Sequence, residues 1–103
     1  MSWIILVVAG LFEIAWAVSL KFTNGFTRFW PTVGTLAGLI TSVGLLGIAA
    51  RSLPISTAYA VWTGIGAVGV VFCGIAFLGE PATPMRLACV ALIIMGIVGL
   101  KFA

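Results

Sequence analysis

The chain has 103 residues, of which 63% are hydrophobic and only 7% are charged. A typical soluble domain carries about 25% charged residues, and a chain of this length could not bury so much apolar surface in a water-soluble core. The formal net charge is +3, but the five basic residues form no cluster, so nucleic-acid binding is not expected. With no His and two acidic residues, the sequence excludes a catalytic triad or a His-containing metal site within one chain, and it predicts no cofactor.

Four apolar segments follow one another along the chain, and each has about the length needed to cross a bilayer as a helix. Only helices and closed barrels span lipid, and these segments lack the alternating pattern of barrel strands. The connections between them are short and rich in proline. The sequence therefore predicts an all-α membrane protein with one domain, residues 1–103, whose transmembrane helices cover residues 3–20, 31–50, 55–78 and 85–102.

The first segment carries Glu13 near its middle. The tripeptide Ala15-Trp16-Ala17 is similar to a signal-peptide cleavage site, but Glu13 interrupts the apolar run and no basic residues precede it, so we expect a membrane span. A carboxylate at this depth is costly unless it is neutralised, paired or hydrated, which marks Glu13 as a functional candidate. Gly10 and Trp16 share its helix face and supply space and an aromatic ring. This face predicts a site for a proton or an organic cation. The competing interpretation is a protonated Glu13 that bonds a neighbouring helix.

The second and third segments carry the remaining candidates for lining such a site. Ser42 is the deepest hydroxyl of the second segment, and it either lines the site or bonds its own helix backbone. Tyr59 and Trp62 lie three residues apart and share one helix face, where Tyr can donate to a carboxylate and Trp can line a cavity. Alternatively, they form an aromatic pair at the membrane interface. Gly64 and Gly66 follow, and we expect them to let this helix bend.

The fourth segment has no strong hydrogen-bonding side chain between Leu87 and Leu100, so we do not expect it to line a cation pathway. Gly96 and Gly99 permit close approach of another helix. We therefore expect this segment to pack a dimer.

Basic residues are nearly balanced between the two sides of the predicted membrane domain. The side with the first and third connections has three and the other side has two, namely Lys21, Arg28 and Arg86 against Arg51 and Lys101. So small a bias permits insertion in both orientations, although a fixed orientation with a weak signal is the alternative. Transporters commonly face each side in turn through inverted repeats, and four helices are too few to hold two. We therefore expect an antiparallel homodimer.

A single intramembrane carboxylate favours transport by competition. Glu13 can hold a proton or an organic cation, but not both at once. If the protein changes the side it faces only when Glu13 is occupied, proton entry drives cation exit. Other classes are a channel, a rotor-type proteolipid and a structural assembly subunit; rotor subunits are usually two-helix hairpins, and an assembly subunit needs no membrane acid. Enzymatic activity is not expected.

The chain resembles the small multidrug resistance family over its full length. The matching segments are Gly10-Leu11-Phe12-Glu13 with Lys21, the loop Asn24-Gly25-Phe26-Thr27-Arg28 leading into Trp30-Pro31, and Pro54 through Gly66 (PISTAYAVWTGIG). Multidrug exporters of this family usually carry Gly where this chain has Trp16 and Tyr where it has Leu39. Trp16 and Ser42, with the Gly99-Leu100-Lys101 ending, are similar to the guanidinium exporters of the family.

This resemblance implies an inner-membrane, antiparallel dimeric antiporter of protons and guanidinium. It further implies that Glu13 binds both proton and substrate, and that the paired Glu13 carboxylates are arranged by Trp16, Ser42, Tyr59 and Trp62. Guanidinium suits such a site because it is a flat cation whose N–H donors pair bidentately with carboxylates. The alternative within the family is an exporter of quaternary ammonium cations.

Overall fold

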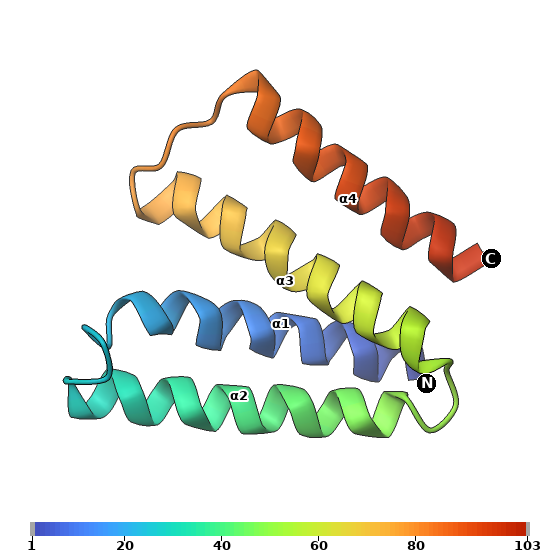
Figure 1. Cartoon of the computed structure of the whole chain (residues 1–103), viewed down its shortest axis with the longest axis horizontal. Helices are drawn as coiled ribbons and strands as arrows, with labels where there is room; N and C mark the ends of the chain where they lie inside the picture. Colours follow the sequence, from blue (N-terminus) through green and yellow to red (C-terminus); the bar gives the residue numbers. More distant parts are fainter. Residues whose placement is uncertain (1, 103) are drawn as a thin grey trace.

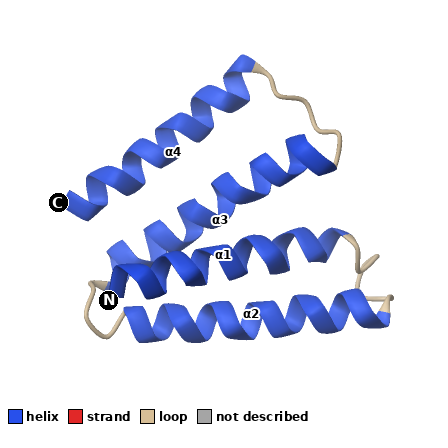
Figure 2. Cartoon of the chain, turned by 180° about the vertical axis from the view of Figure 1, so that it is seen from behind, coloured by secondary structure: helices blue, strands red, loops and turns tan. Residues whose placement is uncertain are grey.

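The computed structural model describes residues 2–102, which form four helices joined by short loops (Figure 1). The helices are α1 (Ser2–Lys21), α2 (Phe29–Ala49), α3 (Ile55–Phe77) and α4 (Pro84–Phe102). Their bounds differ from those of the four apolar segments by at most two residues. Each helix is long and apolar enough to cross a membrane. In the described range every regular element is helical, and the loops lie at the helix ends (Figure 2). The prediction of an all-α membrane protein is confirmed.

Prolines mark the starts of three helices. Pro31 lies in the first turn of α2, Pro54 occupies the N-cap position of α3, and Pro84 is the first residue of α4. The backbone N–H groups of a first helical turn have no intrahelical acceptor, so a residue without an N–H costs nothing there. At the end of α3, the N–H groups of Leu78 and Glu80 both donate to the Gly74 carbonyl, at 3.1 and 3.0 Å. The prolines thus mark where α2, α3 and α4 begin, and the hydrogen bonds to the Gly74 carbonyl close the end of α3.

The loop between α1 and α2 turns sharply through three residues with left-handed backbone angles. Asn24, Gly25 and Phe26 have φ values of 50°, 69° and 68°. Thr23 is buried and holds this turn, since its hydroxyl donates to the Leu20 carbonyl at 2.8 Å and accepts the Phe26 N–H at 3.2 Å. The turn brings α2 back alongside α1.

The helices form a thin layer in which α1 lies between α2 and α3, and α4 lies beyond α3 (Figure 1). The layer measures 41 × 34 × 17 Å. Within the described chain the backbone of α4 comes close to that of α3 alone, and the Lys101 side chain of α4 lies over the Trp3 ring of α1. The buried core sits where the first three helices meet, and its members are Leu6, Ala9, Leu46, Ala49, Ala58, Val61 and Trp62.

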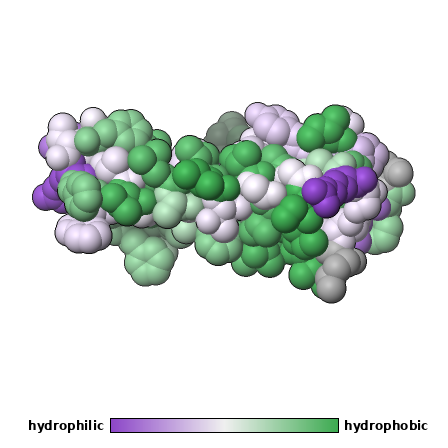
Figure 3. Space-filling model, turned by 90° about the horizontal axis from the view of Figure 1, so that it is seen from below, coloured by the Kyte–Doolittle hydropathy of each residue, from purple (hydrophilic) through white to green (hydrophobic). Residues whose placement is uncertain are grey.

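The outer surface has the character of a lipid-facing one. Large apolar side chains are exposed along all four helices. In the view of Figure 3, hydrophilic residues gather near the two ends of the molecule and apolar residues cover the middle. Trp30 and Phe102 are highly exposed near helix ends, where aromatic side chains meet the membrane–water interface. A helical layer with this surface is suited to a bilayer, since a soluble monomer rarely exposes such large apolar patches.

Candidate functional site

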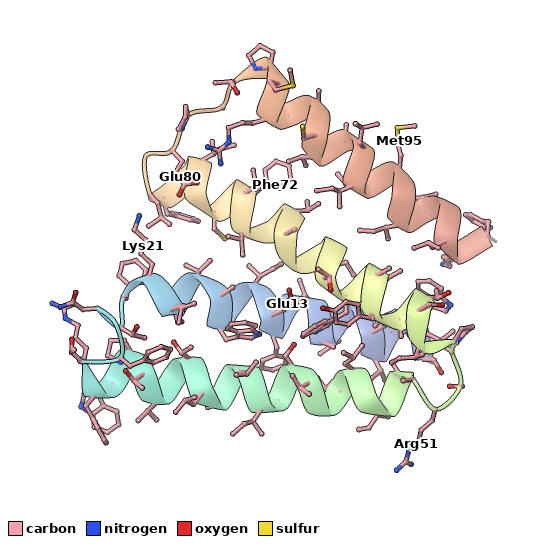
Figure 4. The ribbon with its side chains drawn as sticks, viewed as in Figure 1. Glu13, Lys21, Arg51, Phe72, Glu80 and Met95 are labelled. Carbon is pink, nitrogen blue, oxygen red and sulfur yellow. The ribbon has the colours of Figure 1, made fainter. Side chains whose placement is uncertain are left out.

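Glu13 lies midway along α1 and points toward α3 (Figure 4). Its carboxylate rests against the backbone of α3 at Gly66, where an added Cβ would overlap the carboxylate and lie 2.8 Å from the Glu13 Cγ. Gly66 is buried, so this contact lies inside the layer. The absence of a side chain at Gly66 is therefore what makes room for the Glu13 side chain.

Trp16 turns from the same helix toward α2. A Cβ added to Gly38 would lie 3.0 Å from the Trp16 Cβ, so α1 and α2 approach closely at this level. Within residues 2–102, the buried Glu13 Oε2 and the buried indole Nε1 of Trp16 have no hydrogen-bond partner. A buried polar atom without a partner is costly and is a feature of sites that receive a ligand or a proton.

Ser42 and Trp62 form a buried hydrogen-bond chain that ends on α1. The Trp62 Nε1–H donates to the Ser42 Oγ at 2.8 Å, and the Ser42 hydroxyl donates to the Ala9 carbonyl at 2.6 Å. In an α-helix the carbonyl of Ala9 is also the acceptor for the N–H of Glu13, four residues later. The chain therefore joins α3, α2 and α1 one helical turn from Glu13. The interpretation that the Ser42 hydroxyl bonds the backbone of its own helix is therefore wrong.

Tyr59 and Trp62 share one face of α3, as their spacing predicts. Their ring centroids are 5.8 Å apart and the rings are inclined by 45°. Trp62 is buried, whereas Tyr59 is 57% exposed. The described chain shows no hydrogen bond from Tyr59, Ser42 or Trp62 to the Glu13 carboxylate. The structure thus joins Ser42 and Trp62 to α1 and sets Tyr59 beside Trp62, without a direct bond from any of the three to Glu13.

The other glycines for which the sequence predicts a role fall into two groups, those packed against a neighbouring helix and those with no neighbour in the described chain. Gly10 faces Ile65, whose Cγ2 would lie 2.6 Å from an added Cβ, and Gly64 faces Ile97 of α4 at 2.9 Å. Because α3 stays helical from Ile55 to Phe77, the structure gives its glycines a role in close packing, and the bend at Gly64 and Gly66 stays a prediction.

Gly96 and Gly99 belong to the second group. Nothing in the described chain lies within 4 Å of a Cβ added to either residue, and both are exposed on α4. This face is therefore open in the single chain.

Sequence reasoning missed two partners of the site. Ile65 packs across Gly10, and the Ala9 carbonyl accepts the Ser42 hydroxyl. A backbone carbonyl has no sequence signal of its own. The signal for Ile65 is its position between Gly64 and Gly66, since a large side chain flanked by two glycines is well placed to reach a neighbouring helix.

The site can therefore hold a small cation or a proton. Its one ionisable side chain is a carboxylate, and in the described part of the chain no three metal-ligating side chains come together. A carboxylate among apolar walls favours an occupant that neutralises its charge. The unpartnered Oε2 of Glu13 can accept one hydrogen bond from such an occupant.

Comparisons with known proteins agree with one another. The family model described as Small Multidrug Resistance protein matches residues 1–93. The protein named Guanidinium exporter in Escherichia coli (strain K12) is 61% identical over 103 residues, which are 100% of this chain and 98% of that protein. Proteins of the same name in Citrobacter freundii and Salmonella typhimurium are 55% identical over the same shares of each chain.

Proposed function

This chain belongs to the Small Multidrug Resistance protein family, and from that premise we propose that it exports guanidinium in exchange for protons. The observation that carries the proposal is the partly buried Glu13 side chain, placed midway along α1, whose buried Oε2 is unpartnered in residues 2–102. The relatives named Guanidinium exporter, which match the whole chain, support the choice of substrate.

Glu13 binds the proton and the cation in alternation. A protonated carboxyl and a carboxylate paired with guanidinium are both neutral overall, whereas an empty carboxylate leaves a bare charge in the membrane. The protein changes the side it faces only in the two neutral states. Guanidinium is planar and presents parallel N–H donors, so it pairs with the two oxygens of a carboxylate better than a quaternary ammonium ion without N–H groups does.

The neighbouring side chains shape the site around Glu13. Ser42 and Trp62 hold α1, α2 and α3 in register, because the Trp62 N–H donates to the Ser42 hydroxyl and that hydroxyl donates to the Ala9 carbonyl. Trp16 offers a buried N–H and an aromatic face from the next turn of α1, and Tyr59 extends the aromatic wall from α3. Substrate selectivity follows from this polar and aromatic frame.

The functional unit is an antiparallel homodimer in the inner membrane. The nearly even split of basic residues permits insertion in both orientations. Gly96 and Gly99 leave one face of α4 open for a second copy. Two oppositely oriented chains supply the inverted pair that alternating access requires, and a bend of α3 at Gly64 and Gly66 lets each chain adopt two shapes.

Electrical recording from proteoliposomes tests this function. Wild-type protein should give a proton-coupled current with guanidinium, and Glu13→Gln should fold normally and give none. Coupled transport that persists in Glu13→Gln would refute the role of Glu13. Transport of tetraphenylphosphonium without guanidinium would instead assign the chain to the exporters of large organic cations.

A further inference from the structure

A groove between α1 and α4 is lined by residues near the start of α1 and the end of α4. Both chain termini lie at this end of the layer (Figure 1). The backbones of the two helices stay apart, although the Lys101 side chain of α4 lies over the Trp3 ring of α1. Residues of α3 therefore form the floor of the groove, and α1 and α4 form its walls. The cavity has a volume of about 330 Å³. Its lining is almost entirely apolar and includes Trp3, Val7, Val61, Ile65, Val98 and Lys101. None of the side chains proposed to bind substrate lines it.

A second hollow adjoins the first and is lined by residues of α1 together with Lys101 of α4. Its volume is about 290 Å³, and it shares Trp3, Val7 and Lys101 with the groove. Trp3 and Lys101 therefore line both apolar hollows. An extended apolar chain with a polar end fits this shape better than a compact ligand does.

Lys101 is the charged group of this region. It lies in the last turn of α4, and its Nζ is 5.7 Å from the centroid of the Trp3 ring. Among residues 2–102 the salt bridge formed is that of Arg86 with Glu80, so no side-chain carboxylate in that range pairs with Lys101. A lysine at the end of a transmembrane helix reaches the level of the lipid phosphates.

We infer that the groove between α1 and α4 binds one anionic phospholipid, with an acyl chain along α3 and the phosphate paired with the Lys101 ammonium. The acyl chain gains little by moving from bilayer to groove, because lipid tails are as apolar as the lining side chains. Preference among lipids must therefore come from the headgroup, and a single lysine favours an anionic one. The volume of the groove is at the lower end of the range for ligand cavities, which admits one chain and not a helix.

Native mass spectrometry of the detergent-solubilised protein tests this site directly, with phosphatidylglycerol and phosphatidylcholine of identical acyl chains as probes. Wild-type protein should retain one phosphatidylglycerol per chain, with about fivefold preference over phosphatidylcholine, as one lysine near an anionic headgroup provides. Both lipids carry a phosphate, but the ammonium group of phosphatidylcholine cancels its charge. Lys101→Gln should lose the preference while still binding either lipid weakly. Val98→Trp should lose binding of both lipids, because Val98 is a half-exposed wall residue whose enlargement fills the groove.

Lys21→Gln is the matched control. Lys21 also lies in the last turn of its helix, but at the far end of α1 from Trp3 (Figure 4). Its replacement should leave the preference for phosphatidylglycerol unchanged. Circular dichroism identifies any variant that fails to fold, and Val98→Phe then replaces Val98→Trp.

Two results would overturn the inference. Equal loss of phosphatidylglycerol from Lys101→Gln and Lys21→Gln would mean that the lipid responds only to overall surface charge. Disulfide crosslinking of Val98→Cys to a second copy in membranes, without retained lipid, would mean that protein covers the groove. Because no transport residue is changed, neither result depends on the proposed export of guanidinium.

Discussion

Replacement of Gly66 by Ala tests whether the contact between Glu13 and α3 is essential. An added Cβ would overlap the Glu13 carboxylate and lie 2.8 Å from its Cγ, closer than real Cβ contacts come. Either the carboxylate rotates away or α3 moves outward. Overpacking of this kind costs about 1–3 kcal/mol of folding free energy, whereas Ala in place of Gly within a helix stabilises it by about 1 kcal/mol.

Gly44→Ala separates these two effects. Nothing in residues 2–102 lies within 4 Å of a Cβ added to Gly44, so this variant has the helix-propensity gain alone. Subtracting the change in unfolding free energy of Gly44→Ala from that of Gly66→Ala gives the steric cost, expected to be about 1–3 kcal/mol destabilising. Reversible unfolding in sodium dodecyl sulfate measures both values.

Transport provides the second readout of the same pair. A displaced carboxylate loses its geometry toward guanidinium, and misplacement by about 1 Å commonly lowers a rate by roughly a hundredfold. We expect Gly66→Ala to lower the guanidinium current about tenfold or more, and we expect Gly44→Ala to leave it unchanged. Equal stability and equal transport in the two variants would refute the packing of Glu13 against Gly66.

Three further outcomes follow from the structure. Ser42→Ala leaves the Trp62 N–H without its acceptor and removes one of the two hydrogen bonds to the Ala9 carbonyl, so unfolding should need about 1 kcal/mol less; adding Trp62→Phe should cost less than the sum of the single changes, and strict additivity would contradict the hydrogen bond. Arg86→Gln breaks a salt bridge whose side chains are 36% and 38% exposed, so its effect on unfolding should stay below about 1 kcal/mol and vanish in high salt. Gly96→Leu and Gly99→Leu should reduce dimer crosslinking without changing helicity, because both positions are open in the single chain. Unchanged crosslinking would mean that this face of α4 is not part of the dimer interface.

Much of the fold could be predicted because hydropathy is a local property. Four long apolar runs in a nearly uncharged chain permit few structures other than transmembrane helices. Glu13 stood out for the same reason, since it is a lone charge inside such a run. The family resemblance drawn from short motifs is confirmed by a match over residues 1–93 and by relatives identical at 61%.

The hydroxyls of α2 show where local reasoning ends. Thr35 and Thr41 each donate to a backbone carbonyl of their own helix, four residues earlier and at 2.8 Å. Ser42 instead crosses to the Ala9 carbonyl of α1. Thr35 and Ser42 are seven residues apart on one helix face and both are buried, whereas Thr41 is exposed. The rotation of α2 therefore separates Ser42 from Thr41, and the acceptor that lies across from each buried hydroxyl separates Ser42 from Thr35.

The membrane environment, the four helices and the isolated carboxylate could all be predicted, because each depends on residue composition within one segment. The tertiary structure alone decided what lies against each small residue. Gly38 and Gly66 meet Trp16 and Glu13, whereas Gly44 faces open space. A glycine permits another helix to approach closely, but it does not specify which residue will lie against it. That residue is set by the rotation of the helices and the distance between them.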